Sequence, residues 1–296
     1  MNTAEQESSR KAAGKPVKKG VWLRRGIQIF FFALIAFIAV GKTLGERGIE
    51  IPFATSASLH AVCPFGGVVS FYQFISAGTL VKKVHDSSLV LSGIALVLLI
   101  LAGPVICGWV CPFGSIQEWV GRIGKRLFGK RYNNFIPWNI DRILRYARYL
   151  MLAWVSYMTI MTGKLAFQDV DPYFALFQFW TGEVALTGYI ILGLSLVLSL
   201  FVERPYCKYA CPYGAFQGLF NLVRIFQIKR KASTCIDCKA CDRECPMNIK
   251  VSTSGIVRDH QCISCMECTS ERACPVENTL VLAVGPIDRK PESAQK

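Results

Sequence analysis

The sequence predicts a mainly α-helical membrane protein with a small α+β domain at its C-terminus. Of its 296 residues, 52% are hydrophobic and only 18% are charged, whereas a soluble domain carries about 25% charged residues. Four long apolar stretches lie before residue 203, and most of the 13 cysteines lie after residue 231. This composition excludes a disordered chain and a disulfide-stapled secreted mini-protein.

The four apolar stretches predict four transmembrane helices. A helix needs about 20 mostly apolar residues to cross a bilayer. The third stretch is shorter, but the long side chains of Arg145 and Arg148 at its near end can reach the membrane surface. We therefore expect a basic cytoplasmic tail over residues 1–25 and a four-helix pseudo-repeat over residues 26–202. The expected spans are residues 26–45, 89–110, 149–163 and 184–202.

The net charge of +14 follows from this topology. Most of the 34 Lys and Arg residues lie before the first span, between the second and third spans, or after the fourth. Basic residues concentrate on the cytoplasmic side of a membrane. The sequence therefore predicts a multi-pass protein of the bacterial inner membrane with both termini in the cytoplasm, and we expect no nucleic-acid partner. The basic residues on the other side are Lys42, Arg47, Lys82, Lys83 and Lys164.

Eight cysteines after residue 231 form two groups of four. The first group, from Cys235, has the spacing Cys-x2-Cys-x2-Cys-x3-Cys-Pro of bacterial two-cluster ferredoxins. The second group, from Cys262, differs only in a last gap of five residues. In such a run three neighbouring cysteines bind one 4Fe–4S cluster and the fourth binds the other. The expected ligands are Cys235, Cys238, Cys241 and Cys274 for cluster 1, and Cys245, Cys262, Cys265 and Cys268 for cluster 2.

This spacing predicts a two-cluster ferredoxin domain over residues 231–286. Four thiolates also suit zinc, but two x2-x2 runs that each end in Cys-Pro fit zinc ribbons badly. An interfacial amphipathic segment is expected before the domain, over residues 203–230, and a short tail after it, over residues 287–296.

The membrane part contains an internal repeat with an offset of 100 residues. The motif Cys-x3-Cys-Pro-(Phe/Tyr)-Gly-x2-Gln begins at Cys107 and again at Cys207. Each copy lies at the cytoplasmic end of an even-numbered span, and each proline suits the first turn of an amphipathic helix along the inner membrane surface. The apolar faces expected for these helices are Ile116, Trp119, Val120, Ile123 and Leu127 in the first copy, and Phe216, Leu219, Phe220 and Val223 in the second.

The four cysteines of this repeat predict a third redox site. Residues at positions i and i+4 share one face of a helix, so each pair presents two thiols on one side. Two pairs from related halves suit a 4Fe–4S or a 2Fe–2S cluster. A redox-active dithiol, a metal site used in assembly, and the packing of small residues are the alternatives. The residues of this site are Cys107, Cys111, Cys207 and Cys211.

The repeat extends into the two predicted outer loops. Cys63-Pro64-Phe65 in the first loop corresponds to Asp171-Pro172-Tyr173 in the second. Such partly apolar loops can dip back into the membrane where protein covers their backbone. We assign no role to Cys63.

Residues from about Arg24 to Pro286 resemble the NapH type of ferredoxin-like membrane protein. The resemblance rests on the four spans, the two Cys-x3-Cys-Pro motifs and the double-cluster run at the C-terminus. Related proteins are the membrane domain of NosR-type regulators, copper reductases of the CcoG type and MauN-like proteins. The resemblance implies quinol oxidation, with electrons passed to a partner redox protein.

The sequence thus favours a membrane-bound iron–sulfur protein that acts as a quinol dehydrogenase component or exchanges electrons with the quinone pool. Membrane lipid, the quinone pool and a partner redox protein are the expected partners. Quinol oxidation releases protons and needs a base, for which His60, His85 and Asp86 are weak candidates. The alternatives are a maturation factor that reduces a metal such as copper and a redox-sensing regulator. The expected cofactors are two 4Fe–4S clusters and a third iron–sulfur cluster at the repeat.

Overall fold

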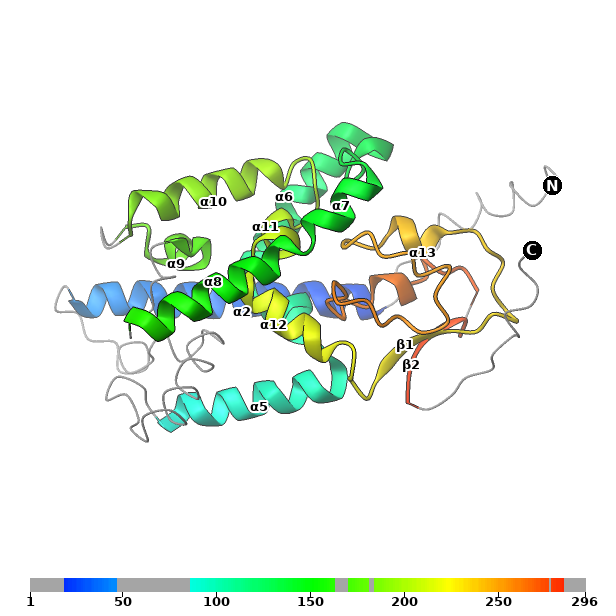
Figure 1. Cartoon of the computed structure of the whole chain (residues 1–296), viewed down its shortest axis with the longest axis horizontal. Helices are drawn as coiled ribbons and strands as arrows, with labels where there is room; N and C mark the ends of the chain where they lie inside the picture. Colours follow the sequence, from blue (N-terminus) through cyan, green and yellow to red (C-terminus); the bar gives the residue numbers. More distant parts are fainter. Residues whose placement is uncertain (1–18, 47–85, 163–169, 181–183, 277, 285–296) are drawn as a thin grey trace.

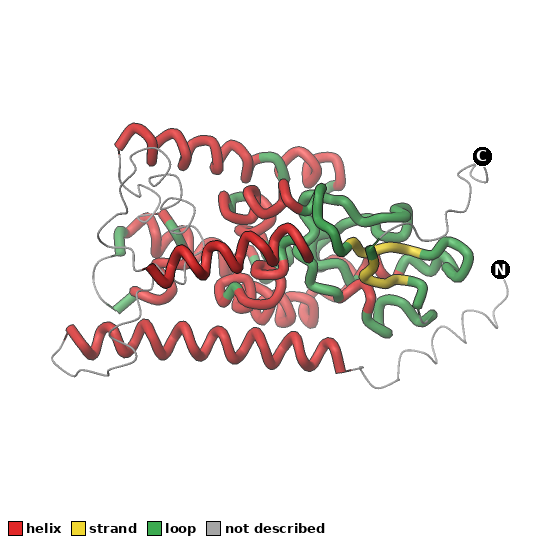
Figure 2. The backbone as a smooth tube through the Cα atoms, turned by 90° about the horizontal axis from the view of Figure 1, so that it is seen from below, coloured by secondary structure: helices red, strands yellow, loops and turns green. Residues whose placement is uncertain are grey.

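A computed structural model describes residues 19–46, 86–162, 170–180, 184–276 and 278–284. The long apolar helices lie side by side, and a domain built mostly of loops caps one end of them (Figures 1 and 2). These helices are α2 (Lys19–Glu46), α5 (Asp86–Ala102), α8 (Ala147–Thr162) and α10 (Leu186–Leu198). Helices α2 and α8 begin at the capped end, whereas α5 and α10 end there (Figure 1). Consecutive long helices therefore run in opposite directions, as expected for successive spans.

Among the described residues, one helix is long and apolar enough to cross a bilayer, namely α2 over Val21–Gly45. The apolar segments Gly93–Ala102 and Leu186–Leu198 are shorter. Helix α5 ends at Ala102 instead of residue 110 because Gly103, with φ of 77°, and Pro104 end the helix there. The helix lengths thus support one complete span among the described residues, and four complete spans stay a prediction.

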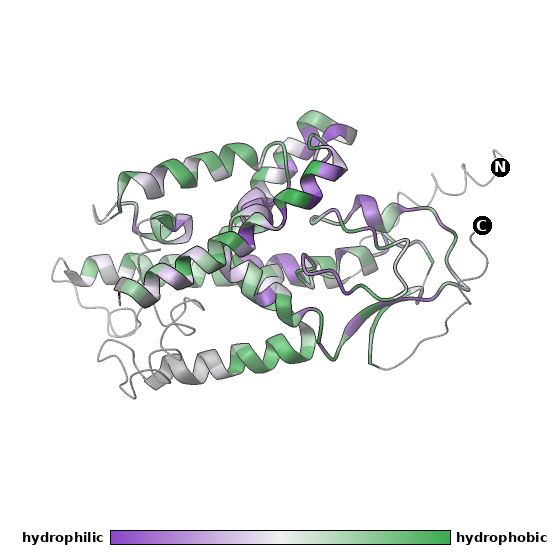
Figure 3. Ribbon diagram, in the orientation of Figure 1, coloured by the Kyte–Doolittle hydropathy of each residue, from purple (hydrophilic) through white to green (hydrophobic). Residues whose placement is uncertain are grey.

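The distribution of side chains is the reverse of that in a water-soluble protein, which exposes charged groups and buries apolar ones. Leu150 in α8 and Leu186 in α10 are each 74% exposed, whereas Arg148, Arg204 and Lys208 are at most 2% exposed. Hydrophobic residues cover the long helices, and hydrophilic ones gather where these helices meet the loop-rich domain (Figure 3).

One amphipathic helix of 17 residues, α6, and several short helices connect the long apolar helices and form the centre of the molecule. Pro112 and Pro212 are the first residues of α6 and α12, as the repeat predicts. A residue before proline avoids the helical conformation, so Cys111 and Cys211 are extended, with ψ of 113° and 114°. The connecting helices are η2 (Ile106–Val110), α6 (Pro112–Phe128), η3 (Gly129–Arg131), α7 (Trp138–Leu144), α9 (Pro172–Gln178), α11 (Pro205–Tyr209) and α12 (Pro212–Phe220).

Helix α6 buries its small and polar residues and exposes part of its apolar face. Gly124 packs against the backbone of Leu200, and Gln117 and Glu118 are buried. Leu127, which belongs to the predicted apolar face, is 69% exposed. The C-terminal part of the apolar face therefore points away from the protein, whereas Trp119 of the same face packs against Phe32 of α2.

The C-terminal domain is held together by a two-stranded sheet and an apolar core. Strands β1 (Gln227–Arg230) and β2 (Leu280–Ala283) are antiparallel, with Gln227 opposite Ala283. Ile228 and Met247 lie in the core with several of the cysteines. Because β1 begins before residue 231, the domain includes residues that we assigned to the interfacial segment. Two short helices complete the domain: α13 (Ala240–Arg243) and η5 (Glu267–Thr269).

Glycines in both halves of the repeat allow the C-terminal domain to approach the helices closely. A Cβ at Gly108 would overlap the carbonyl oxygen of Ile263, and a Cβ at Gly218 would lie 2.5 Å from the carbonyl oxygen of His260. The indole N–H of Trp109 donates to the carbonyl oxygen of Ser264 at 2.9 Å. The domain is therefore packed onto both halves.

Replacing Gly218 by alanine should loosen this packing. The added methyl group meets backbone at the His260 carbonyl, so overpacking should lower the free energy of unfolding by about 1–3 kcal/mol. Thermal unfolding followed by circular dichroism measures the effect. Gly193 in α10 is the matched control, because a Cβ there meets nothing within 4 Å. Equal melting temperatures for the two alanine variants would contradict the close contact.

Candidate functional site

The four cysteines of the repeat surround a single cavity. Its volume is about 110 Å³, and residues of both halves and of the C-terminal domain line it. Aromatic and aliphatic side chains such as Ile35, Phe113 and Tyr206 form much of its wall. The thiols that line it are Cys107, Cys111, Cys207, Cys211 and Cys262.

The backbone presents the two motifs in the same way. Cys111 and Cys211 are the N-cap residues of α6 and α12, and the backbone N–H of Gly214 donates to Sγ of Cys211 at 3.3 Å. Cys107 and Cys207 precede them in η2 and α11. Our expectation of two thiols on one continuous helix face was wrong, because each proline ends the preceding helix at the second cysteine. The partial positive charge of two helix N-termini instead favours thiolates there.

Burial makes these thiols poor nucleophiles on their own. Burial and the neighbouring thiol of Cys111 raise the pKa of Cys207 to about 12, although the guanidinium of Arg204 opposes this rise. Burial also raises the pKa of Cys111. A reactive dithiol needs a lowered pKa, whereas a metal-bound thiol loses its proton outright. The set therefore suits an iron–sulfur group better than a redox-active dithiol.

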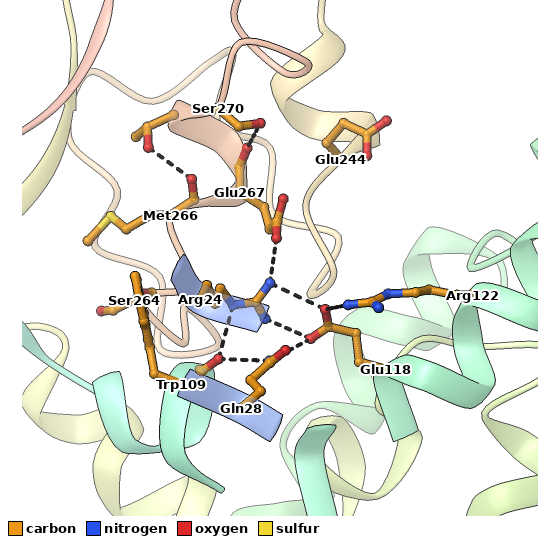
Figure 4. Close-up of polar contacts among 12 residues, drawn as sticks. Arg24, Gln28, Trp109, Glu118, Arg122, Glu244, Ser264, Met266, Glu267 and Ser270 are labelled. Atoms are coloured by element: carbon orange, nitrogen blue, oxygen red, sulfur yellow. Dashed lines mark hydrogen bonds and ion pairs between the residues drawn. The ribbon is translucent and has the colours of Figure 1, made fainter. Parts of the chain in front are cut away.

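A buried charge network adjoins the cavity (Figure 4). Glu118 accepts from Arg24 at 2.6 Å and from Arg204 at 2.7 Å. Arg24 also pairs with Glu267 of η5, and Arg204 donates to the carbonyl oxygen of Cys107 at 2.6 Å. Burial alone would raise the pKa of Glu118, but the two guanidinium groups hold it well below its usual range. Arg24, which we placed in the N-terminal tail, is only 2% exposed within α2.

A carboxyl group also faces the cavity. Asp171 is the N-cap of α9 and accepts from the backbone N–H of Tyr173 at 3.0 Å. Burial raises the pKa of Asp171 to about 7. The sequence suggested an outer loop here, but the chain dips back among the helices, and α9 buries Ala175 and Phe177. Helix α9 of the predicted second loop is therefore packed within the protein.

The eight cysteines of the C-terminal domain divide between two further cavities. One cavity is lined by the first three cysteines of the first group and the last cysteine of the second group. The other cavity is lined by the first three cysteines of the second group and the last cysteine of the first group. The longer last gap of the second group does not prevent this exchange. The cysteines lining the first are Cys235, Cys238, Cys241 and Cys274, and those lining the second are Cys245, Cys262, Cys265 and Cys268.

Two of the three predicted quinol-site bases lie outside the described residues. His60, His85 and Cys63 lie outside the described residues, and Asp86 begins α5 with no description of its side chain. His260, which we did not propose as a base, lines the cysteine cavity. Within the described segments, all twelve cysteines are free thiols, and no three His, Cys, Asp or Glu side chains are close enough to bind one metal ion.

Comparison with known proteins identifies the chain. A family model described as a 4Fe-4S binding domain matches residues 85–131 and 184–232, so each match contains one Cys-x3-Cys-Pro motif. The ferredoxin-type protein NapH of Haemophilus influenzae is 30% identical over 206 residues, which cover 66% of this chain and 69% of that protein. The chain belongs to the NapH family. Like its relatives, it is an iron–sulfur electron-transfer protein.

Other relatives of this NapH-family chain extend over most of its length. YccM of Escherichia coli (strain K12) is 29% identical over 284 residues, covering 92% of this chain and 77% of YccM. The regulatory protein NosR of Stutzerimonas stutzeri is 23% identical. The aligned region covers 92% of this chain and 41% of NosR. No solved structure matches.

Sequence reasoning missed several residues around the cavity of this NapH-family protein. Glu118, Arg24 and Arg204 belong to no sequence motif. Their contacts join residues that are far apart in the sequence. Gln117 and Gln217 occupy equivalent positions of the repeat, and this equivalence could have indicated that they share a role.

Proposed function

We propose that this chain is a membrane-embedded quinol dehydrogenase component that passes electrons through three 4Fe–4S clusters to a partner redox protein. The observation that carries this proposal is the set of three cavities, each bordered by four or more cysteine thiols. When bound, the clusters would supply one-electron chemistry.

The donor sets fit iron–sulfur clusters. Each cavity offers at least four free thiols, and Cys thiolates are the usual ligands of 4Fe–4S clusters. Cys107, Cys111, Cys207 and Cys211 would hold the third cluster, and the two sets of the C-terminal domain would hold clusters 1 and 2. The match of the 4Fe-4S binding family to the segments that contain the repeat motifs supports this assignment.

The cavities follow one another from the helices into the C-terminal domain. Cys262 and Ile263 line both the cavity of the repeat and that of cluster 2. Helix α13, which carries Cys241 of the cluster 1 set, packs against η5, which carries Cys268 of the cluster 2 set. This succession supports transfer between the apolar helices and an aqueous partner.

The surface of the helices supports a multi-pass location in the membrane. Large exposed apolar patches on soluble proteins are rare, yet α5, α8 and α10 expose many aliphatic and aromatic side chains. Examples are Ile94, Val97, Leu150, Tyr157, Ile190 and Val197. Lipid is the solvent that suits such a surface, and the basic residues then favour cytoplasmic termini.

Addition of quinol to the purified, oxidised full-length protein should decrease the broad iron–sulfur absorbance. The measurement is an anaerobic optical titration, with dithionite as the reference for complete reduction. Bleaching by dithionite without any response to quinol would overturn the proposal. Rapid reduction of Cu(II) by the dithionite-reduced protein, again with no response to quinol, would instead favour a copper reductase.

A further inference from the structure

Two buried glutamines occupy equivalent positions in the two halves of the repeat. Gln117 in α6 and Gln217 in α12 each follow the second cysteine of their motif by six residues. Both side chains are fully buried. Burying an amide costs free energy unless its polar atoms find partners, so each position raises the question of what the amide binds.

Each glutamine reaches a cysteine of the opposite half. The Nε2 group of Gln117 donates to Sγ of Cys207 at 3.6 Å, and Sγ of Cys107 lies 2.9 Å from Oε1 of Gln217. The amide of Gln117 is fixed in this direction because its Oε1 accepts from the backbone N–H of Tyr206 at 3.3 Å. Each half of the repeat thus directs an amide at a cysteine of the other half.

The amide of Gln217 has an unpaired donor, and this donor indicates what the amide would bind. Within the described part of the chain, Nε2 of Gln217 is buried and has no hydrogen-bond partner. A neutral thiol at Cys107 donates to Oε1 of this amide, but a thiolate can only accept. Rotation of the amide by half a turn then directs Nε2 at the sulfur, and the unpaired donor acquires a partner.

We propose that Gln117 and Gln217 are positioning residues that donate hydrogen bonds to the Cys207 and Cys107 ligands of the third cluster and thereby raise its reduction potential. This inference rests on the proposed function, since it requires that cluster. Hydrogen bonds to ligand sulfurs are among the factors that set iron–sulfur potentials. The physical reason is that donors stabilise the more negatively charged, reduced state more than the oxidised state.

The test is the midpoint potential of the third cluster in the full-length protein, measured by EPR during an anaerobic redox titration. Gln217→Leu should shift the reduction equilibrium about tenfold toward the oxidised state, which is about 59 mV for a one-electron couple. Gln117→Leu should act in the same direction, and the double variant should shift the potential further. Gln217→Glu keeps the shape of the side chain but loses the amide donor, so it should also lower the potential.

Gln227→Leu is the matched control, because this buried glutamine donates to the carbonyl oxygen of Arg224, away from the cavity. Its third-cluster potential should equal that of the wild type. Unchanged potentials in all the Gln117 and Gln217 variants, with iron still near twelve atoms per chain (about four per cluster), would overturn this inference alone. A wild type with about eight iron atoms per chain would overturn it together with the third cluster.

Discussion

Replacing Cys107 by serine should remove the third cluster and leave the other two in place. Iron in the purified protein should fall from about twelve to about eight atoms per chain, since a 4Fe–4S cluster contributes four. A serine hydroxyl is a far weaker ligand for iron than a thiolate, and the remaining three cysteines form an incomplete set. Iron quantitation together with low-temperature EPR measures the loss.

The functional consequence should be equally large. Cys107 belongs to the cavity between the apolar helices and the C-terminal domain, so its loss should abolish reduction by quinol while dithionite still reduces the remaining clusters. Cys63→Ser is the matched control, because Cys63 lies outside all three proposed ligand sets, and its iron content should equal that of the wild type. An iron content of about eight atoms in wild type and Cys107→Ser alike would eliminate the third cluster.

The grouping of the cysteines could be predicted from their spacing along the chain. In the C-terminal domain Cys235, Cys238 and Cys241 are close neighbours, whereas Cys245 is expected at the other cluster, and the structure gathers the predicted sets around separate cavities. The convergence of Cys107 and Cys207 could be suggested from the repeat, because related halves tend to pack around a common axis. The corners at Cys111 and Cys211 followed from the prolines and could have been anticipated.

The charged residues around the cavity could not be predicted because their partners are far away in the sequence. Arg24 was counted with the basic tail, yet it pairs with Glu118 in α6 and Glu267 in η5. Positive charge near a membrane surface is the ordinary explanation of such an arginine. Only the packing of α2 against η2 and α6 makes it an internal group. For the same reason Asp171 was expected in an outer loop, since hydropathy does not distinguish a surface loop from a re-entrant one.

The network around Glu118 leads to a prediction about stability. Glu118→Gln should lower the free energy of unfolding by about 3–5 kcal/mol, the usual effect of removing one partner from a buried ion pair. Arg204, which is 1% exposed, would keep a buried charge without its counter-charge, and Arg24 would keep only its pair with Glu267. Thermal or denaturant unfolding in detergent, followed by circular dichroism, measures the change. Glu244→Gln is the matched control, because the exposed Lys125–Glu244 pair should contribute only about 0–1 kcal/mol.

The difference in the free energy of unfolding between wild type and Glu118→Gln should depend on pH if it arises from charge, and not if it arises from packing. Arg204 and Arg24 hold the pKa of Glu118 below its usual range in the folded protein, whereas an unfolded glutamate has a pKa of about 4.3. The stability contributed by the carboxylate is therefore fully present above the unfolded pKa and is lost as the pH falls through the folded pKa. This difference in the free energy of unfolding should stay constant from about pH 8 to pH 5 and become smaller only in stronger acid. A difference that does not change with pH even in strong acid would instead assign the loss to packing.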